Sequence, residues 1–130
     1  MHEASSPSAI RLELPAEERG GAIAVKISNL VVQLFRTHTG RGPTKSRTSI
    51  ETNLITVVLR DTLTSGERNL VAGGQAELVT SLRRAYQRMM QDELIAGVEE
   101  LTQREVSALL SDNHVDPDVA VEVFVLEPPA

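Results

Sequence analysis

The chain has 130 residues, a formal net charge of −5 and no cysteine. The lack of cysteine excludes disulfide bonds, thiolate metal sites and cysteine nucleophiles. An acidic total with two phenylalanines, one tyrosine and no tryptophan argues against a nucleic-acid-binding protein, which usually presents a basic face and stacking side chains. The length suits one domain, and no apolar run approaches the ~20 residues that cross a bilayer. We therefore expect a cytoplasmic protein that inserts no segment into a membrane.

The chain begins with a segment that looks unlike the rest. Residues 1–18 are predicted to form a flexible N-terminal arm, because loop-forming serine and proline gather there. The alternating apolar residues over 10–14 leave a second reading open, in which the arm pairs as an edge strand in an oligomer. Residues 19–130 are predicted to form a single α+β domain.

The first half of this domain reads as a helix followed by a hairpin. From Ala22 to Phe35 apolar residues recur at the spacing of one helical stripe, and Gly40 supplies the expected stop. Residues 44–50 and 54–59 are rich in β-branched side chains, so they are predicted to be two strands joined near Asn53.

The second half opens with a sequence that is typical of a helix start. Thr64 and Glu67 have the spacing of a capping box, and the glycines at 73 and 74 are expected to interrupt the helix. A further helix is predicted to begin at Gln75 and end at Thr102, with a length of about 42 Å. Because it is longer than a small sheet needs and carries two apolar stripes, we expect a homodimer through this helix.

A second hairpin completes the predicted fold. Residues 106–110 and 119–126 are expected to be strands, joined by a turn over residues 112–118. Each half then has the order of one αββ unit. We therefore predict two αββ units that form a four-stranded antiparallel sheet with helices packed on one face.

The loop after the first helix is the strongest candidate site. It gathers basic side chains around a Gly-x-Gly-Pro turn without one acid, so it could hold an anion or an acidic partner surface. The simpler reading is that its glycines and proline only turn the chain while its arginines keep it soluble. It lacks the Walker pattern for nucleotide triphosphates. The candidate binding residues are Arg36, His38, Gly40, Arg41, Gly42, Pro43, Lys45 and Arg47.

A second basic cluster, Arg83, Arg84 and Arg88, falls roughly on one side of the long helix. We expect it to pair with Glu77, Asp92 or another subunit. Charge is also uneven along the chain, since residues 1–65 carry 8 basic against 6 acidic side chains (+2) and residues 66–130 carry 5 against 12 (−7). The two halves could meet head to tail or bind a charged partner, or they could be two solvated faces.

The sequence places no catalytic constellation. The histidines at 2, 38 and 114 lack the spacing of a zinc site, and the acidic segment over 112–118 lacks the glycine and glutamate of a calcium loop. No serine lies in a nucleophile elbow. We therefore predict no metal, no cofactor and no enzymatic activity.

Four short features stand out along the chain: Gly40-Arg41-Gly42-Pro43, Leu63-Thr64-x-x-Glu67, Arg83 with Arg84, and Val123-Phe124-Val125-Leu126. Together they are similar to the MpsC family, named for a component of a bacterial sodium-translocating, membrane-potential-generating system. The resemblance covers about residues 23–126. It implies a small cytoplasmic accessory or adaptor protein that works beside membrane transporter subunits or a regulatory protein. The alternative is a small-molecule sensor whose Gly-x-Gly-Pro loop captures an anion.

Overall fold

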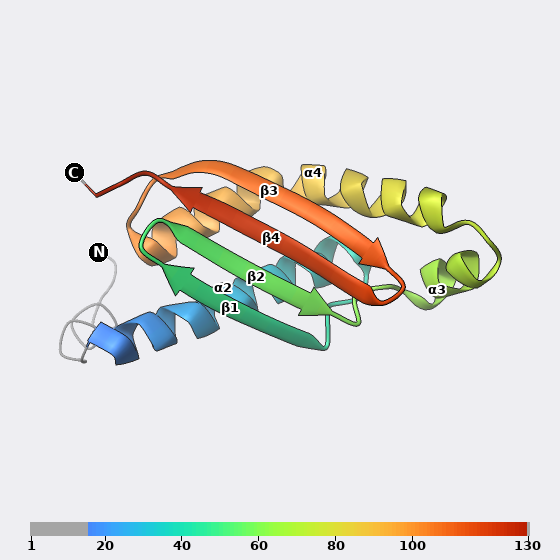
Figure 1. Cartoon of the computed structure of the whole chain (residues 1–130), viewed down its shortest axis with the longest axis horizontal. Helices are drawn as coiled ribbons and strands as arrows, with labels where there is room; N and C mark the ends of the chain where they lie inside the picture. The colour runs from blue at the N-terminus through green and yellow to red at the C-terminus, as the bar shows by residue number, and fades with distance from the viewer. Residues whose placement is uncertain (1–15, 130) are drawn as a thin grey trace.

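The computed structural model describes residues 16–129, and within them three helices and four strands form an α+β fold (Figure 1). The order repeats a helical segment followed by a hairpin, which confirms the two predicted αββ units. The elements are α2 (Ala16–Thr39), β1 (Lys45–Glu51), β2 (Leu54–Arg60), α3 (Ser65–Ala72), α4 (Ala76–Thr102), β3 (Val106–Val115) and β4 (Asp118–Leu126).

Helix α2 begins earlier than its apolar stripe indicates. It begins at Ala16, so the last three residues of the expected arm are helical, whereas residues 1–15 lie outside the described residues. The sequence Ala-Glu-Glu-Arg over 16–19 has high helix propensity. The glycines at 20 and 21 disfavour a helix, so the sequence pattern did not indicate that the helix begins before them. The helix ends at Thr39 as expected, because Gly40 takes a left-handed conformation with φ of 84°.

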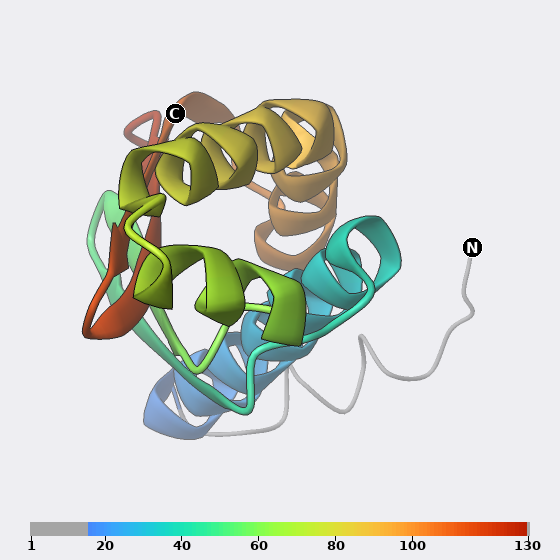
Figure 2. The same cartoon turned by 90° about the vertical axis from the view of Figure 1, so that its right-hand side faces the viewer.

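The four strands form one antiparallel sheet in the order β1-β2-β4-β3. The two hairpins therefore join along β2 and β4, which lie at the centre. Seen along the sheet, the strands lie on one side of the molecule and all three described helices on the other (Figure 2). This confirms the predicted layering.

The second hairpin differs from the prediction in length. Strand β3 continues to Val115, so Asp116 and Pro117 alone connect it to β4, and the turn expected over residues 112–118 does not exist. Asp and Asn have low strand propensity, which hid this extension. The ladder with β4 overrides that propensity, since it pairs each residue from Leu109 to Val115.

The core lies between the sheet and the helices. Alternate residues of the two central strands and one stripe of each long helix meet there with almost no exposed surface. The main contributors are Ile27, Val31 and Phe35 from α2, Met90, Leu94 and Val98 from α4, and Ile55, Val57, Leu59 and Phe124 from the strands.

The two long helices are in tight contact at Gly97 of α4. A Cβ atom added there would lie 2.5 Å from Cδ2 of Leu30 on α2. The helices can keep their present contact only while this position carries no side chain.

We expect Gly97→Ala to lower the free energy of unfolding by about 1 to 3 kcal/mol, because the new methyl group displaces Leu30 from a packed interface. Gly21→Ala is the matched control. No atom lies within 4 Å of a Cβ at Gly21, so its helix should gain about 0.5 to 1 kcal/mol. Urea unfolding measures both, and a Gly97→Ala protein as stable as the wild type would contradict the close approach.

Candidate functional site

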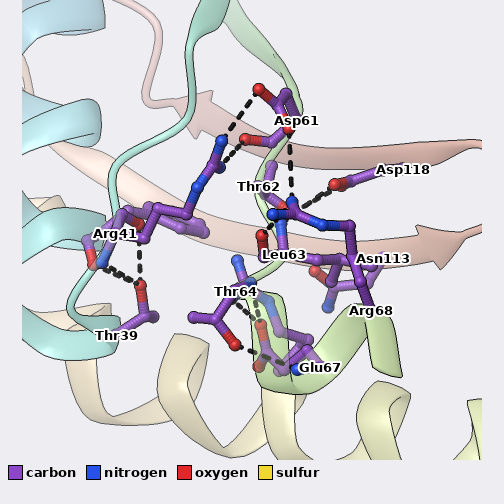
Figure 3. Close-up of polar contacts among 12 residues, drawn as sticks. Thr39, Arg41, Asp61, Thr62, Leu63, Thr64, Glu67, Arg68, Asn113 and Asp118 are labelled. Carbon is purple, nitrogen blue, oxygen red and sulfur yellow. Dashed lines mark hydrogen bonds and ion pairs between the residues drawn. The ribbon is translucent and has the colours of Figure 1, made fainter. Parts of the chain in front are cut away.

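The Gly-x-Gly-Pro loop is bound to the segment that follows β2. The Arg41 guanidinium donates through Nη1 to the backbone oxygen of Asp61 and through Nη2 to its Oδ2, at 2.9 Å (Figure 3). Thr44 Oγ1 donates to the same Oδ2 at 2.8 Å. The Thr44 hydroxyl first, and then the Arg41 guanidinium, hold the pKa of Asp61 below its ordinary value. Arg41 therefore anchors the loop within its own domain.

The segment after β2 is also fixed from its other side, by the start of β4. Asp118 accepts hydrogen bonds from Thr62 Oγ1 at 2.7 Å and from the Leu63 backbone N–H at 3.0 Å (Figure 3). Thr64 then caps α3, as its sequence predicts, and exchanges two hydrogen bonds with Glu67. We call residues 61–64, together with the side chains that hold them, the junction.

Beneath the junction lies a buried ion pair. Arg83 of α4, 1% exposed, donates to Glu67 Oε1 at 3.0 Å, and Glu67 is 4% exposed. The same oxygen accepts from the Thr64 backbone N–H. The guanidinium carbon lies 5.7 Å from the centre of the Phe35 ring of α2, at the distance of a cation–π contact. One ion pair thus connects all three helices.

The structure does not gather the eight loop candidates into one site. Arg36 bonds to Gln33 on its own helix, and His38 contacts Glu93 of α4 at 2.8 Å. Lys45 and Arg47 are exposed on β1. The remaining members turn the chain, since Gly40 ends α2, Gly42 lies close to α2 and Pro43 is buried.

The second basic cluster is also divided. Arg83 is buried on Glu67, whereas Arg84 pairs with Asp112 of β3 at 3.1 Å, so the partners differ from Glu77 and Asp92, which we expected. Arg88 is exposed and, with Arg84, lines a cleft of about 210 Å³ between α4 and β3. The cleft is completed by Gln87, Gln91, Leu109 and Ser111.

A local motif that sequence reasoning missed occurs in both halves. Thr39 Oγ1 donates to the carbonyl four residues back and accepts from the Arg41 N–H. Thr102 makes the same two bonds: it donates to the carbonyl of Val98 and accepts from the Arg104 N–H. Gln103, like Gly40, has a left-handed backbone conformation. Each arginine then binds the residue that follows the second strand of its own hairpin, Asp61 or Glu127. The signal in the sequence is the repeated Thr-x-Arg after each long helix.

Sequence reasoning also missed Glu122, a fully buried carboxylate on β4. Gln87 Nε2 donates to it at 2.7 Å, and the Ser111 hydroxyl bonds to its other oxygen. Asn113 Nδ2 in turn donates to Gln87 Oε1 at 2.6 Å. No arginine or lysine contacts this carboxylate within the described chain, and burial raises the pKa of Glu122 to about 7. The sequence signal is one acid among the inward positions of an apolar strand.

Across residues 16–129, no three His, Cys, Asp or Glu side chains are grouped so that they could hold a metal ion. Of the helices in this part of the chain, none is long and apolar enough to cross a membrane. The charged groups at the junction pair with one another, so they hold the loop, the strands and the helices together. The expectations of no cofactor and no catalysis stay predictions.

The buried pair should dominate the stability of the helical layer. Glu67→Ala leaves Arg83 buried without its carboxylate, so we expect a loss of about 3 to 5 kcal/mol. Thr64→Ala, which removes only the cap hydroxyl, should cost about 1 kcal/mol. Urea unfolding compares the two, and equal losses would show that the ion pair is not the larger contribution.

The Glu122 carboxyl should make stability depend on pH. Its pKa is raised to about 7 from 4.5, so the folded state retains a proton that the unfolded state releases between these values. The contribution of Glu122 to the free energy of unfolding is fully present below about pH 4.5. It is lost as pH rises through 7, by roughly 3 kcal/mol in total. Glu122→Gln should remove this slope and be the more stable protein at pH 8. Thermal melting across pH 5 to 8 measures it, with exposed Glu100→Gln as the control that keeps the slope.

Comparison with known proteins agrees with the resemblance seen in the motifs. The family described as Na+-translocating membrane potential-generating system (MpsC) matches residues 19–128. No curated protein and no solved structure matches the chain significantly. Some of the residues that carried the resemblance lie at the junction, since Arg41 binds it and Thr64, Glu67 and Arg83 form its base. Arg84 and the segment 123–126 lie elsewhere, on Asp112 and at the other end of β4. This match spans nearly the whole described chain, and the protein therefore belongs to the MpsC family.

Proposed function

We propose that this protein is a non-enzymatic accessory subunit that acts in the cytoplasm beside the membrane subunits of a Na+-translocating, membrane-potential-generating system. Membership of the MpsC family supports the assignment of the protein to such a system. The chemistry of the junction supports a role without catalysis, because its acids and bases bind one another. An accessory protein of this kind acts through its surfaces, and one surface carries the proposal.

That surface is an apolar stripe on the N-terminal half of α4. Leu78, Leu82 and Met89 are 54%, 39% and 66% exposed, and with Ala85 they follow the spacing of one helix face. The core residues of α4 lie on its opposite side. Exposed leucine and methionine at helical spacing are typical of a helix that pairs with another helix.

The partner of this stripe is proposed to be a second copy of α4, antiparallel to the first. In this arrangement Leu78 lies against Met89 of the partner and Leu82 against Ala85, so the stripe matches itself about a two-fold axis. The homodimer contact that the helix length predicted for residues 75–102 is thereby narrowed to residues 78–89.

The second candidate is a sensor of small anions. The observation that favours it is the cleft between α4 and β3, where Arg84 and Arg88 lie above the buried Gln87 and Glu122. The loop favours it less, because Arg41 is bound to Asp61. Two properties argue for the accessory role instead: Arg84 is already paired with Asp112, and a buried carboxylate beneath the cleft disfavours an anion.

A host strain without this gene should lose Na+-dependent membrane potential, and the wild-type gene should restore it. Met89→Glu should restore it poorly, because a carboxylate in the stripe weakens the α4 contact at least about tenfold. Light scattering on purified protein should show Met89→Glu at half the wild-type mass, with Gln91→Glu, exposed on another side of α4, unchanged. An unaltered potential in the deletion strain would contradict the accessory role and favour the sensor.

A further inference from the structure

The sheet has an outer face that no helix of the described chain covers. In Figure 1 this face is turned toward the viewer with the helices behind it, and Figure 2 shows the strands at the margin of the molecule. The inward positions of the central strands are buried, so the intervening residues form the outer face. Its apolar members are Leu54, Val58, Ala108, Leu110, Val119, Val121, Val123 and Val125.

The composition of this face is unusual for a solvated surface. An antiparallel sheet with one face on the core normally alternates apolar inside with polar outside. Strand β4 instead has valine at each of its four outward positions, from Val119 to Val125, and Leu110 beside them is 60% exposed. A central strand with apolar residues on both faces is typical of a sheet that is covered on both faces.

Charged side chains lie mainly along the edges of the outer face, where β1 also carries Glu51, and Arg60 lies at the end of the central strand β2. Lys45 and Arg47 lie on edge strand β1, and Asp112 lies on the opposite edge strand β3. The register places Arg47, Val58, Val121 and Asp112 in one row across all four strands. The row thus begins with a cation, ends with an anion and is apolar between them.

We propose that the outer face binds the outer face of a second copy of this chain, about a two-fold axis parallel to the strands and between β2 and β4. Such an axis keeps each row in register and exchanges the edges, so that β1 lies over β3 of the partner. Arg47 then meets Asp112 of the partner subunit, and Val58 meets Val121 of the partner subunit. Both ends of the row gain an ion pair while the valines between them are buried.

The other two-fold axis, perpendicular to the strands, fits less well. It would give Lys45 an acidic partner in Glu51, but it would place Asp112 over Leu110 of the partner subunit. A carboxylate held against a leucine loses water without gaining a cation. The parallel axis gives Asp112 a cation in Arg47, while it places Lys45 over His114 of the partner subunit and Glu51 over Ala108 of the partner subunit. Arg60 lies over an apolar residue under either axis.

The contact is expected to be modest in strength. Four strands about 4.8 Å apart and seven residues at about 3.3 Å each give a footprint of roughly 19 by 23 Å. That is about half the area per partner of a standard protein interface, which indicates association that depends on micromolar concentration. It does not rest on the α4 contact, which lies on the opposite layer of the molecule, and the two contacts together would join four copies or more.

The test uses sedimentation equilibrium on full-length protein over a range from low micromolar to submillimolar concentration. It is done in the Met89→Glu background, so that the α4 contact does not contribute. We expect a dimer that Arg47→Asp weakens at least about tenfold, that Asp112→Arg weakens likewise, and that the double exchange restores. Arg88→Asp, the same charge reversal on the helical side, should change nothing.

Asp112 also binds Arg84, so thermal melting of each variant must show that it is folded. Leu110→Glu, at an exposed position that the fold tolerates, is a second disruption that should also weaken the dimer. A monomer in the Met89→Glu background, or no recovery in the folded double exchange, would overturn the sheet contact. Recovery through a Lys45→Glu and Glu51→Lys exchange instead would overturn the proposed axis. None of these outcomes changes the result in the deletion strain, so the proposed function fails or stands separately.

Discussion

The buried Arg83–Glu67 pair is the contact on which the rest of this structure depends. Arg83 lies in the N-terminal third of α4, Glu67 lies in the first turn of α3, and the guanidinium lies over Phe35 of α2. Because a charged group in the interior requires its partner, α3 and α4 cannot separate without isolating a buried charge, and α2 packs against the guanidinium through Phe35. Glu67 also bonds to the Thr64 backbone, which fixes the segment between β2 and α3. That segment in turn holds Arg41, and with it the loop that leads into the sheet.

The two halves of the domain repeat a common plan and differ in the Gly-x-Gly-Pro loop of the first half and in helix α3 of the second. Each long helix ends in a left-handed residue between a threonine and an arginine, and each arginine returns to the end of its own hairpin. This explains the arginine of the Gly-x-Gly-Pro loop without a ligand, since Arg104 does the same work in a half that has no such loop. The copies differ at α3, which only the second half contains, and the buried ion pair attaches this helix to the repeat.

The surfaces of the molecule fit a protein that acts by binding other chains. The charged groups of the junction pair with one another, and Glu122 is buried among neutral donors. Of the exposed large apolar residues in the described chain, Leu78, Leu82 and Met89 are grouped on one face of α4, and Leu110 lies on the outer face of the sheet beside the outward valines of β4. The others, Val25, Ile50 and Leu70, lie elsewhere. Apolar surface that is grouped rather than scattered is typical of interaction sites, and an accessory subunit of a membrane system would use such sites.

The sequence by itself determined the order of elements, the layering and most helix and strand ends, because periodicity, glycine stops and the Thr64 capping box act over a few residues. It did not determine the length of β3, because residues such as Asp112 and Asn113 are strand residues only through their ladder with β4. It could not show that Arg41 binds Asp61, that Arg83 is buried on Glu67, or that Glu122 lies inside. Those facts join residues that are distant in the chain, and local pattern carries no information about which distant charges the packed helices and strands bring together.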